Sequence, residues 1–174
     1  MTAVMHADSR DEVLRRLMEA YEVPIRRMCC VYLRDAALAD DAVQETFLKA
    51  YMALDQFRGE SSERTWLMRI AVNTCHSMRR SGWLRFIDRR ITLDRLPEPT
   101  ISADYGLTEL LADIMRLPQK LIDVVLLHDY QGFTVREIGE MLDIPYQTAT
   151  SRLQSAHKKL RIVLTDTRKG GAPK

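Results

Sequence analysis

Apolar residues recur at intervals of three and four along most of the chain, with polar residues between them. This spacing places the apolar side chains on one face of an α-helix. The stretches that show it are residues 11–21, 25–33, 38–54, 65–80, 107–117, 118–131, 135–142 and 146–160. Because glycine is scarce and long stretches lack both glycine and proline, the pattern predicts an all-α protein.

The two clearest helices of the first half lie on either side of a polar loop. Leu38–Leu54 has an apolar stripe made by Val43, Phe47, Ala50, Tyr51 and Leu54. Thr65–Arg80 has one made by Trp66, Leu67, Ile70, Ala71, Thr74 and Met78. Nearer the N-terminus, Pro24 lacks an amide hydrogen, so we expect a kink or a break between residues 11–21 and 25–33.

The helical pattern is lost in the middle of the chain, where Pro97 and Pro99 lie. Proline disfavours helix in the residue before it and marks extended or turn segments. We therefore expect two small helical domains, residues 1–80 and 107–174, joined by an extended linker at residues 81–106.

The 174 residues carry a net charge of +2, but the charges are unevenly distributed. Residues 35–63 contain seven acidic and two basic side chains, residues 64–95 eight arginines and two aspartates, and residues 145–174 seven basic side chains and one aspartate. One acidic segment and two basic segments suggest two kinds of partner. The alternative is that these are ordinary solvated faces, which would give the same pattern. The N-terminus lacks the apolar run that a signal peptide requires. No other stretch approaches the roughly 20 apolar residues of a membrane span, so we expect a cytoplasmic protein.

The three cysteines, Cys29, Cys30 and Cys75, form no recognisable disulfide framework. Cys75 and His76 could be imagined as a metal site with the vicinal pair, but their spacing fits no common zinc pattern. Buried reduced thiols are the favoured interpretation, and we expect no metal and no cofactor. The four histidines are scattered, and no glycine-rich phosphate loop or nucleophile motif is present. An enzyme is therefore not expected.

The last third of the chain has the pattern of a helix-turn-helix. Thr134 and Glu137 match the capping box, in which the two side chains satisfy free amide groups at a helix start. The short helix that follows is predicted to bury Ile138 and Leu142. A tight break at Pro145 separates it from a second helix.

The second helix of this motif has a narrow apolar stripe made by Ala149, Leu153, Ala156 and Leu160. Its other side carries Gln147, Thr150, Ser151, Arg152, Gln154, Ser155, Lys158 and Lys159. Short polar and basic side chains opposite an apolar stripe suit a helix that enters the major groove of DNA. The alternative to DNA binding is a plain helix hairpin on the surface. The combination of a capping box, a short break at proline and a basic second helix makes that alternative less favoured.

Two blocks of the sequence resemble the extracytoplasmic-function sigma factors, which are transcription initiation factors of the bacterial sigma-70 family. The first resembles their region 2 and consists of D-D-A-V-Q-E-T-F-L-K-A-Y at Asp40–Tyr51, D-Q-F-R-G at Asp55–Gly59 and R-T-W-L-M-R-I-A-V-N-T at Arg64–Thr74. The second resembles region 4 and consists of L-P-Q-K at Leu117–Lys120, G-F-T-V-R-E-I-G-E-M-L at Gly132–Leu142 and I-P-Y-Q-T-A-T-S-R-L at Ile144–Leu153.

The resemblance implies a protein that binds core RNA polymerase and directs it to promoter DNA. It also implies an anti-sigma factor, often membrane-bound in the family, as a further partner. The family's counterpart of Leu38–Leu54 docks on a coiled coil of the largest polymerase subunit. On its exposed side, the resemblance assigns core-polymerase binding to Asp41, Gln44 and Glu45. A face of carboxylates and an amide suits a basic partner.

The family reads the promoter's downstream (−10) element as unpaired DNA, with the loop matching residues 57–64 and the next helix. The residues implied here are Phe57, Arg58, Arg64, Arg69, Asn73, Arg79 and Arg80. Trp66 could stack on a base, but its spacing favours the core. Glu63 stands where many relatives have an aromatic or neutral residue. A carboxylate near phosphate is unfavourable, so we expect Glu63 either to contact a base or to point away.

The family reads the upstream (−35) element with the second helix of the region 4 pair. The residues implied here are Tyr146, Gln147, Thr150, Ser151, Arg152, Gln154, Ser155 and Lys158. Relatives often carry basic residues at the positions of Thr150, Ser155 and His157. Their absence here predicts fewer phosphate contacts and a shallower dependence on salt. Arg152 could bind a guanine or a phosphate, and the sequence leaves this choice open.

A stand-alone DNA-binding regulator is the alternative function. It would account for the helix-turn-helix but would leave the acidic helix and the Arg64–Thr74 block without a role. Such regulators usually dimerise to span two half-sites, and the sequence shows no heptads for dimerisation.

Overall fold

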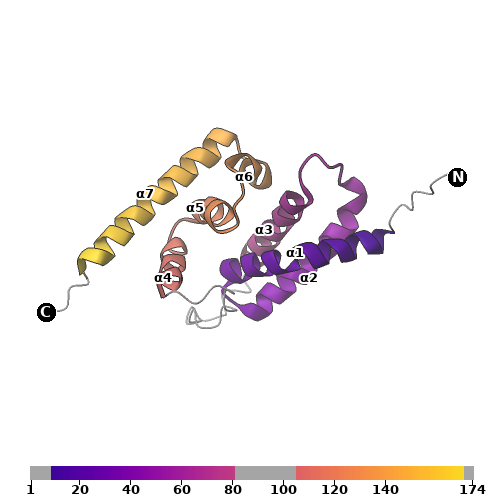
Figure 1. Cartoon of the computed structure of the whole chain (residues 1–174), viewed down its shortest axis with the longest axis horizontal. Helices are drawn as coiled ribbons and strands as arrows, with labels where there is room; N and C mark the ends of the chain where they lie inside the picture. Colours follow the sequence, from indigo (N-terminus) through magenta and orange to yellow (C-terminus); the bar gives the residue numbers. More distant parts are fainter. Residues whose placement is uncertain (1–8, 81–104, 171–174) are drawn as a thin grey trace. The chain divides into compact units, whose positions relative to one another are not determined.

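The structure, a computed structural model, describes residues 9–80 and 105–170 of the chain (Figure 1). Within these ranges every regular element is a helix, which confirms the all-α prediction. The chain divides into two compact units, Met1–Pro97 and Glu98–Lys174. The predicted linker, residues 81–106, falls almost entirely outside the described residues.

The first unit is a bundle of three helices that all contact one another (Figure 1). Its elements are α1 (Arg10–Leu33), α2 (Ala36–Ala53), a short 3-10 helix η1 (Leu54–Gln56) and α3 (Glu63–Arg80). Buried apolar side chains from all three long helices fill the space between them. The most buried of these include Leu17, Ile25, Met28, Ala39, Ala50, Leu67, Met68, Ala71 and Val72.

Helix α1 runs through Pro24 without interruption, so the predicted break is wrong. Its start is fixed by Ser9, whose hydroxyl accepts from the amide of Glu12 while the Glu12 carboxylate accepts from the amide of Ser9. Proline removes one hydrogen bond from the helix ladder. Leu17 and Ile25 are buried on either side of it, and we attribute the continuity of the helix to their packing.

The buried side of α3 is centred on Leu67, Met68, Ala71 and Val72. Trp66, which the sequence places in the core, is only half-buried, so that expectation is wrong. The reason is that α3 packs against both α1 and α2. The buried side is consequently turned toward Met68 and Val72, and Trp66 lies at its margin.

The second unit contains α4 (Tyr105–Ile114), α5 (Gln119–Val125), the π-helical turn η4 (Leu126–Tyr130), α6 (Val135–Leu142) and α7 (Tyr146–Gly170) (Figure 1). Helix α7 contacts α4, α5 and α6. Its predicted stripe is confirmed, because Ala149, Leu153, Ala156 and Leu160 are all buried. The long helix α7 is thus the element against which the rest of the second unit packs.

The helix predicted to begin at Pro118 starts as α5 and ends in the π-helical turn η4. There the amide of Gln131 donates to the carbonyl oxygen of Leu126, five residues earlier. The predicted stop at Gly132 is confirmed: its φ is +75°, a conformation that suits glycine because it has no Cβ.

The capping box at the start of α6 is confirmed. The hydroxyl of Thr134 accepts from the amide of Glu137, and the Glu137 carboxylate accepts from the amide of Thr134. Ile138 is buried as predicted, but Leu142 is only half-buried and Met141 is buried in its place. Ile138 and Met141 are three residues apart and so lie on the same side of α6, while Leu142 lies at the end of the helix.

Candidate protein and nucleic-acid interfaces

The exposed side of α2 carries the three residues predicted to bind polymerase. Asp41 and Gln44 are exposed and Glu45 is half-buried. Leu48 and Met52 follow at helical spacing on the same side and are 55% and 68% exposed. We call these five residues the α2 face. The sequence analysis missed Leu48 and Met52. Both are apolar, lie outside the buried stripe and follow Asp41 by seven and eleven positions, so helical spacing already indicated that they share its side of α2.

Part of the α2 face is held by contacts within the first unit. The Nζ atom of Lys49 lies 3.2 Å from Glu45 Oε1 and donates to Thr74 Oγ1 of α3 at 3.2 Å. In the part of the chain that the structure describes, the side chains of Asp41 and Gln44 have no such partner. These two groups can therefore bind a partner without breaking an existing contact.

The neighbouring carboxylate, Asp40, has a different role. It accepts from Arg26 Nε at 2.6 Å and so joins α2 to α1. The hydrogen bond that Arg26 donates to Asp40 raises the pKa of Arg26 above its ordinary value. Asp40 thus supports the packing of the bundle, whereas Asp41 projects to solvent.

Phe57 and Trp66 form an aromatic pair at the loop between α2 and α3. Their ring centroids are 4.7 Å apart and the rings are tilted by 31°. Both side chains are half-buried, and Arg58 is exposed beside them. Gly59 follows with a φ of +72°, where an L side chain would be strained. Accessible aromatic surface next to a cation is what the binding of unpaired bases requires.

One side of α3 continues from this aromatic pair. Arg69, Asn73 and Arg80 are exposed and follow Trp66 at intervals that place all four on the same side of the helix. The structure therefore adds Trp66 to three residues that the sequence analysis assigned together to the −10 site. They form a strip with an aromatic side chain at one end and cations along it, which we call the α3 strip.

Two other arginines predicted for the −10 site lie away from the α3 strip. Arg64 is half-buried in the first turn of α3. Arg79 is exposed on another side of α3 and lies near Arg34, whose pKa is lowered first by burial and then by the charge of Arg79. The structure thus does not bring Arg64 and Arg79 together with the other predicted residues.

Glu63 forms an ion pair with Arg16 of α1. Arg16 donates from Nη1 to Oε2 at 2.9 Å and from Nη2 to Oε1 at 2.7 Å. The hydrogen bonds from Arg16 lower the pKa of Glu63 below its ordinary value. Glu63 therefore points toward α1, so of the two expectations for this residue the structure favours the one in which it points away.

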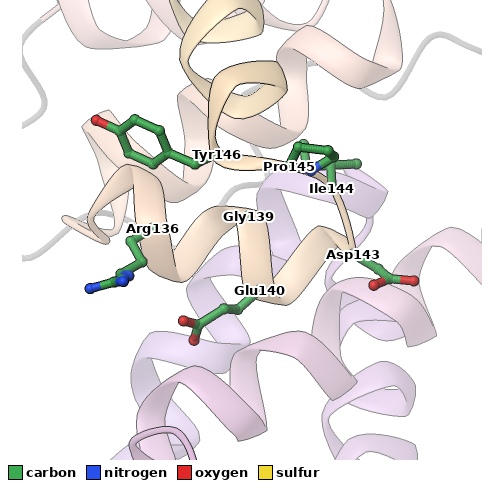
Figure 2. A pocket seen from close by; sticks show the side chains of 7 residues that line it. All are labelled: Arg136, Gly139, Glu140, Asp143, Ile144, Pro145 and Tyr146. Atoms are coloured by element: carbon green, nitrogen blue, oxygen red, sulfur yellow. The ribbon is translucent and has the colours of Figure 1, made fainter.

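The turn between α6 and α7 is tight. Asp143 ends α6 with a φ of 53°, and α7 begins at Tyr146. Arg136 and Glu140 project from α6, and Tyr146 from the first turn of α7, around a shallow hollow (Figure 2). Tyr146 is 57% exposed. The first turns of α7 are thus presented to solvent, as a recognition helix requires.

The outward side of α7 carries most of the residues predicted for the −35 element. The exposed ones are Tyr146, Gln147, Ser151, Gln154, Ser155 and Lys158, whereas Thr150 and Arg152 are half-buried. The hydroxyl of Thr150 donates to the carbonyl oxygen of Tyr146, and that of Ser151 donates to the carbonyl oxygen of Thr148, each at 3.0 Å. In this arrangement these hydroxyls can only accept from a ligand. Gln147 and Gln154 present both a donor and an acceptor.

One further contact ties α7 to the π-helical turn. Asp129 lies between two imidazoles, with Oδ1 2.6 Å from His128 Nδ1 and Oδ2 2.6 Å from His157 Nε2. His157 stands at one of the positions where relatives often have a basic residue. Its ring bonds to Asp129 and is therefore directed toward the second unit's own surface.

The three cysteines are buried and reduced, as predicted. Cys29 and Cys75 share a hydrogen bond, and this bond together with burial raises the pKa of the Cys29 thiol. Among the described residues there is no cluster of histidine, cysteine and carboxylate side chains that could hold a metal ion. Nor does any helix in the described ranges have the length and apolar character needed to cross a membrane.

Comparison with known proteins places both units in one family. Residues 17–85 match Sigma-70 region 2 and residues 107–160 match Sigma-70, region 4. The chain is 33% identical over 139 residues to the ECF RNA polymerase sigma-E factor of Haemophilus influenzae, covering 69% of this chain and 71% of that one. It is 28% identical over 158 residues to the RNA polymerase sigma-H factor of Pseudomonas aeruginosa, covering 83% and 82%.

Solved structures show the same fold. The sigma factor RpoE of Bartonella quintana, solved with the anti-sigma factor NepR, gives a TM-score of 0.71 at 20% identity, covering 87% of this chain and 96% of that one. CnrH, solved with the cytosolic domain of CnrY, gives 0.70 at 23% identity, covering 90% of each chain. Together with the two matched regions and the sequence relatives, these findings show that the chain belongs to the extracytoplasmic-function sigma factors of the sigma-70 family.

Proposed function

We propose that this sigma factor binds core RNA polymerase through the α2 face and reads a promoter with its two units. Residues 1–80 bind the polymerase and the −10 element, and residues 107–174 bind the −35 element. Residues 81–106 link the two. The observation that carries the proposal is the α2 face, where the acidic Asp41 and the amide of Gln44 have no other partner in the described chain and adjoin exposed apolar side chains.

The composition of the α2 face fits a basic, partly apolar partner. Carboxylates attract a positively charged surface and set the orientation of binding, while desolvated apolar side chains at the centre of an interface contribute most of its affinity. Leu48 and Met52 are placed to supply the second contribution. The family's use of this helix to dock on the polymerase supports the same assignment.

For the −10 element, we propose that the aromatic pair and the α3 strip hold unpaired bases and phosphates. Stacking on an accessible aromatic ring tolerates any base, and cations along the same side follow the phosphate backbone. The primary −10 residues are therefore Phe57, Arg58, Trp66, Arg69, Asn73 and Arg80. Arg64 and Arg79, which lie away from the α3 strip, are proposed as secondary contacts.

For the −35 element, we propose that the exposed side of α7 enters the major groove. Gln147 and Gln154 have the donor and acceptor needed for the edge of an adenine, and Lys158 provides a phosphate contact. Half-buried Arg152 lies at the edge of this surface and still has no partner in the described chain. It is available to a guanine or to a phosphate.

We further propose that the chain acts by binding and has no catalytic activity of its own. Work on the chromosome implies a cytoplasmic location. An anti-sigma factor is a proposed partner, supported by the solved structure of the same fold that contains the anti-sigma factor NepR.

The test is direct binding of the purified full chain to bacterial core RNA polymerase. Asp41→Lys breaks no hydrogen bond or ion pair among the described residues, and the double variant Asp41→Lys with Glu45→Lys reverses more of the face. A matched control reverses two exposed carboxylates of α1, Glu19 and Glu22. We expect tight binding by the wild-type chain and the control, and loss of binding in the α2-face variants with unchanged circular dichroism.

The alternative of a stand-alone regulator gives a different result in the same experiment. A well-folded chain that binds promoter DNA but does not bind core polymerase would support the regulator and refute the proposed role of the α2 face. Normal polymerase binding by the double variant would refute the role of the α2 face and leave the sigma function itself unaffected.

A further inference from the structure

The first two turns of α1 extend beyond the core of the first unit. No residue from Arg10 to Arg16 is buried, and the buried side of the helix begins at Leu17. Val13 and Leu14 are half-buried, and charged side chains of this segment make hydrogen bonds and ion pairs with the rest of the unit. These contacts all reach the two ends of the loop between α2 and α3.

At the α3 end of the loop, Arg16 holds Glu63 in a two-bond ion pair. The two terminal nitrogens of the guanidinium donate to separate carboxylate oxygens, a geometry that fixes orientation as well as distance. Ser62, next to Glu63, bonds through its hydroxyl to the amide of Thr65. The start of α3 is thus fixed by the Ser62–Thr65 bond within the helix and by the Arg16–Glu63 pair from α1.

At the α2 end of the loop, Arg10 and Asp11 make the corresponding contacts. Arg10 donates to the carbonyl oxygen of Tyr51 at 2.7 Å and lies 3.0 Å from Asp55. Its guanidinium also lies 4.8 Å from the centre of the Tyr51 ring. The hydroxyl of Tyr51 donates to Asp11 at 2.9 Å. One helical segment therefore holds both ends of the loop that carries Phe57.

Stability alone does not explain this arrangement. Ion pairs between exposed side chains typically contribute about 0–1 kcal/mol to folding, and the side chains of Arg16 and Glu63 are 52% and 31% exposed. What such pairs can do well is restrict geometry. A loop that holds a base must be ordered before it binds, because ordering it at the moment of binding reduces affinity.

We propose that residues Arg10–Arg16 of α1 clamp the loop between α2 and α3 in the shape that reads the −10 element, with Arg16 and Glu63 as positioning residues. The inference rests on the proposed −10 function of this loop. It gives Glu63 a role that does not require a carboxylate to touch DNA. It also assigns a function to Arg16, which lies outside every predicted site.

The test uses holoenzyme formed with the full chain and a promoter library in which the −10 bases are randomised. The variants are Arg16→Glu, Glu63→Arg and the double charge swap. Arg16→Lys keeps the charge but loses the two-bond geometry. Arg15→Glu is the matched control, since Arg15 is an exposed neighbour on α1 and makes none of the loop contacts described above.

We expect each single reversal to lower transcription from the preferred −10 sequences by roughly 10- to 100-fold, the scale at which misplaced groups cost activity. The range of accepted sequences should widen. The charge swap should restore both properties, and Arg16→Lys should fall between wild type and Arg16→Glu. Binding to core polymerase and to −35 duplex should be unchanged throughout.

Two results would overturn the clamp. If the charge swap is no better than the single reversals, Glu63 or Arg16 acts on DNA directly, and if the single reversals have no effect, the pair positions nothing. A further result would contradict the proposed −10 function and not the clamp. If the wild-type holoenzyme shows no preference among −10 sequences, the loop does not read the −10 element. Circular dichroism and thermal unfolding identify any variant that fails to fold, and Arg16→Lys then still tests the two-bond geometry.

Discussion

Gly139 of α6 lies so close to Ile144 that a Cβ at position 139 would stand 3.0 Å from the carbonyl oxygen of Ile144. That oxygen belongs to the backbone of the tight turn and cannot move as a flexible side chain would. Glycine at this position therefore allows α6 and α7 to approach as the helix-turn-helix requires.

Gly139→Ala is expected to lower the free energy of unfolding of the second unit by up to about 2 kcal/mol. Alanine favours helix by roughly 1 kcal/mol over glycine, but crowding in a packed site typically costs about 1–3 kcal/mol. Thermal unfolding of the full chain measures the change. Glu140→Ala, an exposed change on the same helix, should leave stability nearly unchanged. If Gly139→Ala were as stable as the wild-type chain or more stable, the turn at Ile144 would have to relax to admit the Cβ.

Trp66→Ala is expected to weaken binding of −10 single-stranded DNA by holoenzyme by about 1–3 kcal/mol, the usual contribution of one stacked base. The ring packs against Phe57 and is only half-buried, so part of it is accessible to DNA. Trp66→Phe keeps an aromatic ring and should retain most of the affinity. Binding to −35 duplex serves as the control, and an equal loss there would indicate a general folding defect instead.

The sequence predicted most of the fold because the fold depends on periodicity and on local caps. The stripe at Ala149 and Leu160 and the capping box at Thr134 are visible in a few consecutive residues. The break at Pro24 was wrong because local propensity is weaker than packing on both sides of the proline. The core position expected for Trp66 was wrong because α3 packs against both α1 and α2, and periodicity alone does not show how that packing turns the buried side.

The candidate site was less accessible to sequence reasoning. Helical spacing alone places Asp41, Leu48 and Met52 on one side of α2, so this surface could have been found in full. The pairing of Arg16 with Glu63 spans 47 residues. Nothing local indicates it, because charged side chains on two helices reveal their partners only when the helices are placed in space.

The lowered pKa of Glu63 gives the Arg16 pair a dependence on pH. A carboxyl whose pKa is lower in the folded state contributes stability above its ordinary pKa of 4.5, and this stability is lost as pH falls through the lower, folded value. The pair should thus be intact at neutral pH and weaken only in acid below pH 4.5. Titration of the Glu63 side chain by carbon NMR is the measurement. Arg16→Gln should raise its pKa toward 4.5, and an unchanged value would show that the pair does not form in solution.

The exposed glutamines of α7 and its lysine should affect DNA binding in different ways. A glutamine amide can donate to and accept from the edge of an adenine, so Gln154→Ala should cost about 1–3 kcal/mol on the preferred −35 sequence and relax the preference at one position. Lys158 carries a single point charge on a flexible stem, and we expect it to contact phosphate. Lys158→Ala should weaken all sequences alike and reduce the salt slope by about one. Binding of the full chain to a set of −35 duplexes at several salt concentrations separates the two effects. A uniform loss in the glutamine variant would contradict base reading by Gln154, because a residue that only approaches the backbone cannot distinguish one base pair from another.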